Sequence, residues 1–241
     1  MDGAAGAVAL MRSVGQGSAQ PSHAIFFDAA RLAEENRDFA DRTGQGALLE
    51  PAVDGVLLHF DDAEADAAFC ADPPAQVDDP NAHDVAARFL WSERFFPLKF
   101  QRMGPSQLAG EVVLPPERVA KFVKGAHRFA RRFGAHAAVE SIVARVPDGD
   151  DRREEWVTIV AFPCDASRGF DYFWRLVLVQ LITHLGVRLG GRPYGLGIWN
   201  APFAGRALGR ERWQRLTQRK RALDPARLLN PGKFFRIRTR L

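Results

Sequence analysis

Residues 189–200, LGGRPYGLGIWN, combine glycines with side chains that can bind and react. The Arg192 guanidinium is a planar fork of donors that suits a carboxylate or a polarised oxygen. The Tyr194 phenol can donate, accept or orient a proton beside a reacting group. Trp199 offers an aromatic face, and the Asn200 amide can both donate and accept hydrogen bonds. The pattern predicts a ligand-contacting loop, but a turn that buries Tyr194 and Trp199 in the core would use the same glycines.

A second candidate lies in KRALDPARLLNPGKFF, residues 220–235. Asp224-Pro225 can start a helical turn, because aspartate caps free N–H groups and proline suits the first helical position. Asn230-Pro231-Gly232 predicts a tight turn that leaves Lys233 projecting. Two interpretations stay open: the segment is a structural clasp, or Asn230 and Lys233 border a bound cofactor.

Several common catalytic signatures are absent from the sequence. It contains no GxxxxGK[ST] phosphate loop, no HExxH helix, no GxSxG elbow and no Gly-x-Gly-x-x-Gly after a predicted strand. The six histidines are scattered without a metal-type pair, which predicts no metal site. Cys70 and Cys164 lie far apart, and we expect both to be buried thiols.

Hydrophobic periodicity predicts the elements that must position these residues. Alternating apolar residues indicate strands at 54–60, 110–115, 135–146 and 156–162, the last two joined by a turn at 147–155. Apolar residues at helical spacing indicate helices at 64–71, 83–96, 115–134, 170–186 and 210–221, and residues 21–36 read as a loop followed by a helix. The fold class is therefore α+β, an antiparallel sheet with helices on one face in a ferredoxin-like arrangement, followed by a C-terminal helical segment.

Charge is distributed unevenly along the 241 residues. Residues 50–90 contain ten acidic and one basic residue, whereas residues 205–241 contain twelve basic and two acidic residues. Such a basic end can bind nucleic acid or an anionic membrane, but its interleaved apolar residues favour the solvated face of an amphipathic helix. No run of about 18 uncharged apolar residues occurs, and the N-terminus lacks the basic start of a secretory signal. We therefore expect a cytoplasmic protein with no transmembrane segment and no nucleic-acid partner.

The closing stretch KRALDPARLLNPGKFF resembles the C-terminal signature of FAD-linked oxidases of the vanillyl-alcohol oxidase, D-lactate dehydrogenase and glycolate oxidase type. GGRPYGLGIWN stands where that family carries a Gly-rich stretch that approaches the flavin. LWSERFFPLKF (90–100) and GEVVLPPERVAKFV (110–123) are similar to the family's cap domain. The resemblance implies an N-terminal segment at 1–50, a cap or substrate-binding domain at 51–188, and a flavin-approaching loop with a C-terminal helix and clasp at 189–241.

The resemblance also implies an FAD-dependent oxidoreductase that oxidises an alcohol or a 2-hydroxy acid, because a bound flavin carries the hydride chemistry itself. Tyr194 would accept the proton, and Arg192 would hold a substrate carboxylate or polarised oxygen. The remaining implied contacts are Arg94, Lys99, Trp199 and Asn200 for the substrate, and Gly191, Gly195, Asn230 and Lys233 for the cofactor. For Arg94 and Lys99 the alternative is a surface ion pair.

That family binds FAD mainly through an N-terminal domain with a Gly-rich loop for the pyrophosphate, and this sequence contains no such loop. The resemblance therefore implies an FAD-binding domain or subunit supplied elsewhere. The alternative is a non-catalytic interaction subunit that keeps the cap fold without flavin, and a nucleic-acid binder acting through the basic tail ranks third. The oxidoreductase hypothesis and the non-catalytic-subunit hypothesis differ in whether Arg192, Tyr194 and Lys233 converge on one open surface.

Overall fold

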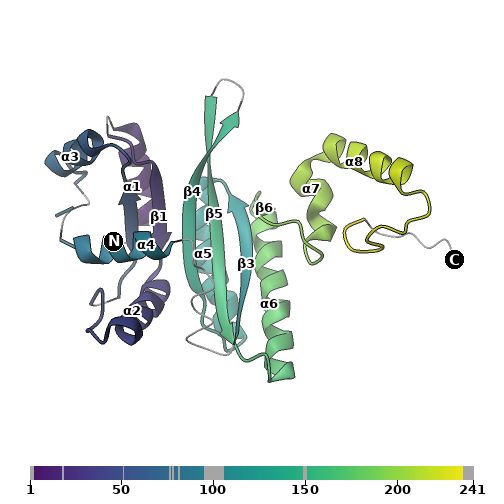
Figure 1. Ribbon diagram of the computed structural model, residues 1–241, viewed down its shortest axis with the longest axis horizontal. Coiled ribbons are helices and arrows are strands. Elements are labelled where there is room, and N and C mark those ends of the chain that lie inside the picture. Colours follow the sequence, from purple (N-terminus) through teal and green to yellow (C-terminus); the bar gives the residue numbers. More distant parts are fainter. Residues whose placement is uncertain are drawn as a thin grey trace.

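The computed structural model describes residues 3–17, 19–50, 52–75, 77, 79–80, 82–94, 106–148 and 151–235. Its centre is a six-stranded sheet in the order β2-β1-β4-β5-β3-β6 (Figure 1). The strands are β1 (His23–Phe27), β2 (Gly55–His59), β3 (Ser106–Leu114), β4 (Ala138–Asp148), β5 (Asp151–Cys164) and β6 (Arg192–Pro193). All neighbouring pairs are antiparallel, which confirms the predicted α+β class.

Helices cover the two faces of this sheet unequally. The face shared by all the long strands is covered by α1 (Gly3–Gln16), α5 (Pro116–Arg132) and α6 (Gly169–Arg188). On the other face, α2 (Ala29–Thr43) and α4 (Asp84–Glu93) cover the end formed by β2, β1 and β4. The remaining helices are α3 (Ala63–Ala71), which packs on α1, and α7 (Ala204–Leu208) and α8 (Arg210–Leu223), which follow β6. The sequence predicted helices on one face, and α2 and α4 add a partial layer on the second.

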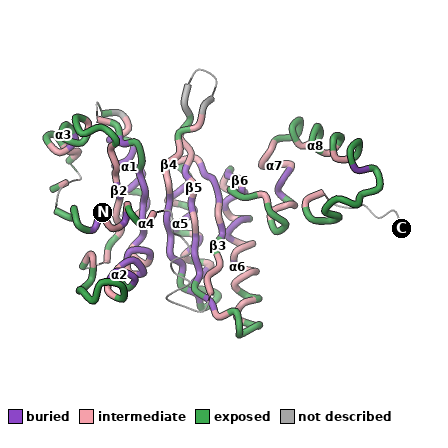
Figure 2. Tube along the Cα trace, viewed as in Figure 1, coloured by how far each residue is buried: buried purple, intermediate pink, exposed green. Residues whose placement is uncertain are grey.

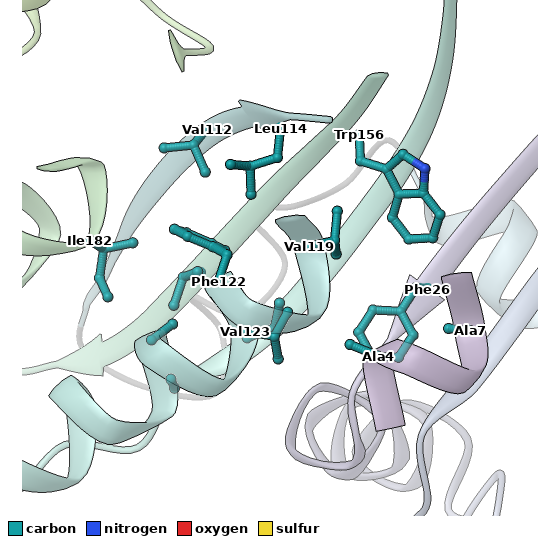
Figure 3. Close-up of a cluster of buried hydrophobic side chains, with 14 of the residues drawn as sticks. Ala4, Ala7, Phe26, Val112, Leu114, Val119, Phe122, Val123, Trp156 and Ile182 are labelled. Atoms are coloured by element: carbon teal, nitrogen blue, oxygen red, sulfur yellow. The ribbon is translucent and has the colours of Figure 1, made fainter. Parts of the chain in front are cut away.

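The main core lies between the sheet and the layer of α1, α5 and α6 (Figure 3). Helix α5 begins with Pro116, as predicted, and its buried stripe includes Val119, Phe122 and Val123. Trp156 of β5 is fully buried against this stripe. Burying each such large side chain stabilises the fold by about 1.5–3 kcal/mol, so this contact holds the helical layer on the sheet.

Strand β1 corrects the prediction of a loop before the helix at 21–36. It pairs with β2 on one side and β4 on the other. Phe26 faces α1 and α5, whereas Ile25 and Phe27 pack with α2 and α4, so both sides of the strand are buried. A strand buried on both faces reads as a continuous apolar run without alternation, which explains the missed strand. Residues 3–50 thus contribute an inner strand and part of the main core.

Helix α2 buries a cluster of charges against the sheet. The Arg31 Nη2 atom lies 2.9 Å from Glu140 Oε2 of β4. Arg31 also lies 3.5 Å from a carboxylate oxygen of Glu34 and 3.4 Å from one of Glu35. Burial raises the pKa of Glu34, and the Arg31 charge opposes this rise. Arg31 is therefore the cation that three buried carboxylates share.

Replacing Arg31 with methionine should destabilise the fold by about 3–5 kcal/mol in urea denaturation at neutral pH, because the change leaves buried carboxylates without their cation. The deficit should shrink in acid, where the carboxylates bind protons. Arg37 is exposed on the same helix, and Arg37→Met should cost under about 1 kcal/mol. Equal losses in the two variants would contradict a stabilising role for the cluster.

Candidate functional site

The sheet face opposite α5 and α6 carries chemically active side chains over β5, β3 and β6. Strand register sets their positions: Glu111 pairs with Ile159, and Val113 pairs with both Val157 and Arg192. Because side chains alternate along strands, these residues point away from the main core. We call this surface the open face, and its members are Glu111, Glu155, Val157, Ile159, Arg192 and Tyr194, while Val113 points to the same side but is buried.

Glu111 is the carboxylate of the open face that lacks a partner. It is half-buried, and no hydrogen bond or ion pair to its side chain occurs within the described residues. Burial raises its pKa. Glu111 is therefore suited to accept a proton from a bound hydroxyl group. Glu111 was not among the predicted site residues, although a charged residue within the apolar run GEVVLP was a usable signal.

Arg192 is held in place by an acidic neighbour. Its Nη2 donates to Glu155 Oε2 at 2.5 Å, and the other oxygen of Glu155 accepts from Arg153 Nη2 at 2.8 Å. Glu155 thus neutralises much of the positive charge that Arg192 would offer to a carboxylate ligand. The remaining guanidinium N–H groups can still donate to a neutral oxygen.

Tyr194 and Trp199 lie on the surface. Tyr194 follows β6 and donates its backbone N–H to the Glu111 carbonyl at 3.1 Å, which extends the β3–β6 pairing by one residue. Tyr194 is 59% exposed and Trp199 is 62% exposed. The alternative that these two aromatic residues fill the core is therefore wrong. Alternation from Arg192 places Tyr194 on the open face, beside Glu111.

One of the two polar groups of the Asn200 side-chain amide has a hydrogen-bond partner. The Nδ2 group donates to the Gly195 carbonyl at 2.8 Å, whereas Oδ1 is buried without a hydrogen-bond partner among the described residues. An unused buried acceptor is costly unless a donor reaches it. Asn200 can therefore receive an N–H group from a ligand.

The two glycines predicted to contact a cofactor have different surroundings. A Cβ on Gly191 would lie 2.4 Å from the Val113 carbonyl oxygen and 2.7 Å from Leu114 Cδ2. A Cβ on Gly195 would meet no atom within 4 Å. Close packing of the backbone on β3 accounts for glycine at 191, and only Gly195 leaves open space for a ligand.

Gly191→Ala should destabilise the protein by about 1–3 kcal/mol, because the added methyl group clashes with backbone that cannot move aside. Gly195→Ala should change the stability by no more than about 0.5 kcal/mol. Thermal and urea unfolding of the two variants measure this contrast. A Gly191→Ala protein as stable as the Gly195→Ala protein would show that packing does not require this glycine.

Arg94 lies far along the sheet from Arg192. It ends α4, and its guanidinium carbon lies 3.4 Å from the centre of the Trp91 ring. Trp91 in turn stacks on His59 of β2, with ring centres 3.6 Å apart. Since β2 and β6 form opposite ends of the sheet, the structure does not bring Arg94 together with Arg192. Lys99 lies outside the described residues.

The clasp, residues 224–235, is organised by Asp224. This carboxylate is 6% exposed and accepts from the backbone N–H groups of Leu228 and Leu229 at 2.8 and 3.1 Å. It also pairs with Lys220 of α8, whose Nζ donates to the Leu229 carbonyl at 2.7 Å. The Lys220 contact and the backbone donors lower the pKa of Asp224. Asp224 thus caps free N–H groups, as predicted.

The end of the clasp returns to α8 and encloses a cleft. Phe234 and Phe235 contact the Trp213 ring, with centres 5.5 and 5.3 Å away. The cleft between them has a volume of about 950 Å³, and its lining includes Ala201, Pro202, Trp213, Lys220, Arg221, Arg227 and Asn230. Asn230 therefore lines this cleft, and so does Ala201, the residue that follows Asn200 in the chain. Lys233 is not among the lining residues. The clasp lies apart from β6 and the open face (Figure 1), so Lys233 does not converge with Arg192 and Tyr194.

The Asp224 carboxylate should titrate below its usual pKa of about 3.9. Its contribution to clasp stability is then complete above that value and is lost as the pH falls through the lowered folded pKa. The amide NMR signals of Leu228 and Leu229 should report this midpoint. Asp224→Asn should remove the transition and speed tryptic cleavage after Arg227 roughly tenfold. Asp66→Asn, at an exposed position on α3, should do neither.

Residues 174–234, from α6 through most of the clasp, match the family described as FAD linked oxidases, C-terminal domain. This match confirms the resemblance to the C-terminal part of FAD-linked oxidases of the vanillyl-alcohol oxidase type that the closing motif indicated. No curated protein matches the sequence.

Two solved oxidase structures share the fold. 4-Ethylphenol oxidase from Gulosibacter chungangensis, in an isoeugenol complex, aligns with a TM-score of 0.63 and 17% identity, over 97% of this chain and 51% of that chain. Substrate-bound p-cresol methylhydroxylase aligns with a TM-score of 0.62 and 14% identity, over 96% and 50%. The chain therefore spans about half the length of the structures it matches.

Two further findings concern metals and membranes. Across the described ranges, no group of three or more His, Cys, Asp or Glu side chains is arranged to hold a metal ion. No helix in the described part of the chain combines the length and the apolar character that crossing a bilayer requires.

Proposed function

We propose that this chain is the substrate-binding and C-terminal part of an FAD-dependent oxidoreductase that oxidises an alcohol by hydride transfer to flavin. The observation that carries the proposal is the open face, where strand register places Glu111, Arg192 and Tyr194 on one side of the sheet that no helix within the described ranges covers. Lys233, which was expected beside Arg192 and Tyr194, lies on the clasp instead, so the proposal rests on the open face alone. An FAD-binding domain or subunit, supplied elsewhere, covers this face in the working enzyme. Bound flavin would supply the hydride acceptor for this reaction.

Glu111 takes the alcohol proton in this proposal. Tyr194 was predicted to take this role, but a carboxylate is a common general base, and burial raises the pKa of Glu111, which makes this carboxylate more basic. Tyr194, next to Glu111, orients the hydroxyl group by hydrogen bonding. Arg192, fixed by Glu155, donates to the substrate oxygen.

The charges of the open face favour a neutral alcohol over a 2-hydroxy acid. Glu155 engages both Arg192 and Arg153, and Glu111 remains as an uncompensated negative charge. A substrate carboxylate would therefore meet repulsion from Glu111 and an arginine that is already occupied. The names of the two structural neighbours refer to 4-ethylphenol and p-cresol, neither of which has a carboxylate, which is consistent with a substrate other than a 2-hydroxy acid.

The chain's own residues can contact only part of a flavin cofactor. Gly195 leaves space for close approach, and the unpartnered Asn200 Oδ1 can accept from an N–H group of the ring. Asn230, in the wall of the cleft, and the exposed Lys233 can donate to cofactor oxygens. The sequence has no Gly-rich loop for the pyrophosphate, so the main FAD site belongs to the partner domain.

The C-terminal segment offers a surface on which that domain can dock. None of the residues of α8 is buried (Figure 2). Leu223, Leu228 and Leu229 are 75%, 77% and 61% exposed. Exposed leucines this close together are typical of a surface that another body covers. The clasp therefore joins the substrate-binding part to the FAD-binding domain.

The function is tested by purifying the tagged chain from its native cells and measuring bound flavin and dye reduction with a neutral alcohol. We expect flavin in the purified complex and alcohol-dependent activity. Glu111→Gln should lower kcat/KM by about 100-fold with the flavin content unchanged. The acidic limb of the pH profile should lie above the usual glutamate pKa of about 4.3 and disappear in this variant.

Glu64→Gln is the matched control, because Glu64 is an exposed glutamate on the distant helix α3. It should leave kcat/KM unchanged. A complex that contains a partner chain but no flavin would favour the non-catalytic subunit and overturn the proposal. Preference for a 2-hydroxy acid over the corresponding alcohol would overturn the substrate assignment alone.

A further inference from the structure

The adjoining ends of α5 and α6 carry an exposed cluster of aromatic rings that the proposed function does not use. We call it the aromatic patch, and its members are Phe133, Phe170, Phe173 and Trp174, exposed by 36%, 78%, 56% and 38%. The Trp174 ring centre lies 6.1, 5.9 and 5.7 Å from those of Phe133, Phe170 and Phe173, respectively. The four rings therefore form one continuous apolar surface, which a monomer in water seldom leaves uncovered.

The rim of the aromatic patch is positively charged. The residues next to the rings in the sequence include four arginines, against two aspartates: Arg131, Arg132, Arg168, Arg175, Asp165 and Asp171. Asp171 is paired with Arg175 at 3.2 Å. Arg131 and Arg132 are exposed, with no acidic partner within the described residues. The positive end of the α6 dipole, at the first turn of this helix, adds to the field.

The aromatic patch lies away from the surfaces assigned to the FAD-binding domain. It belongs to the layer of α5 and α6, whereas the open face is on the other side of the sheet. It is also at the first turns of α6, and the rest of this helix, from Trp174 to Arg188, separates it by about 20 Å from the end that leads to β6. A domain seated on the open face and the clasp would leave the aromatic patch exposed.

The positive charge of the rim distinguishes between a second copy of the chain and a membrane as the binding partner of the aromatic patch. A second copy docked through the same surface would bring the arginine rims together, which costs free energy through like-charge repulsion. An anionic membrane surface avoids this repulsion. Phenylalanine and tryptophan rings are favoured in the interfacial region of a bilayer, and arginines beside them are attracted to acidic headgroups.

We propose that the aromatic patch docks this chain peripherally on anionic membrane surfaces. The rings of Phe170 and Phe173, the most exposed of the four, enter the headgroup region, and Arg131 and Arg132 bind lipid phosphates. This inference rests on the proposed function in one respect, the placement of the FAD-binding domain on the open face and the clasp, and vesicle binding tests it separately from flavin content and activity.

The test is co-sedimentation of the full chain with vesicles of phosphatidylcholine alone and of phosphatidylcholine mixed with phosphatidylglycerol. Wild-type protein should sediment with the mixed vesicles and only weakly with the neutral ones. Phe170→Ser with Phe173→Ser should lower the partition coefficient by at least about tenfold, because both rings then leave the interface. Arg131→Gln with Arg132→Gln should lower it by about fivefold for each charge removed.

Matched controls separate the aromatic patch from general surface properties. Val85 on α4 is 70% exposed, and Val85→Ser should keep wild-type binding. Arg212 and Arg219 are exposed on α8, and changing both to glutamine should also leave most of the binding intact. The proposal would be overturned if the α8 variant lost vesicle binding while the Phe170/Phe173 variant kept it. The absence of binding to either vesicle, or a wild-type dimer that the Phe170/Phe173 change converts to monomers, would also overturn it.

Discussion

The arrangement of this protein depends on one contact, the packing of the α5 apolar stripe against the sheet. Phe122 and Val119 are fully buried against Trp156 and its neighbours on β5. Because side chains alternate along a strand, burying Trp156 on this side forces Glu155 and Val157 to the opposite side. Antiparallel register then carries the alternation to β3 and β6, which places Glu111 and Arg192 on the open face. A slip of one residue would bury these charges and expose the core.

Charge compensation decides which polar groups are available to a ligand. Arg31 compensates for buried carboxylates under α2, and Asp224 is compensated by Lys220 and the backbone of the clasp. On the open face, Glu155 pairs with Arg192, so the carboxylate that has no partner among the described residues is Glu111. The chemistry that the open face can offer a ligand thus depends on which charged side chain is not paired with another described residue. Residue types alone would have pointed to the arginine.

In the proposed functions, three exposed surfaces of the chain bind three different partners. The open face takes the substrate, and the clasp with α8 takes the FAD-binding domain. The aromatic patch, on the outer helical layer, takes a membrane surface. These surfaces lie on different layers and ends of the molecule (Figures 1 and 2), so all three can be occupied at once.

Local patterns in the sequence predicted the α+β class, most strands and helices, capping by Asp224 and the resemblance to the C-terminal part of FAD-linked oxidases. These features depend on local patterns: apolar period, capping by Asp224, and the Asn-Pro-Gly-Lys ending. Strand β1 was missed because burial on both faces removes the alternation that marks a strand. Three features could be seen only in the folded chain: Gly191 packs closely on β3, Arg94 lies apart from Arg192, and Glu111 lies opposite Tyr194 on the open face. Each of these depends on cross-strand register between segments distant in sequence, and no local pattern encodes that register.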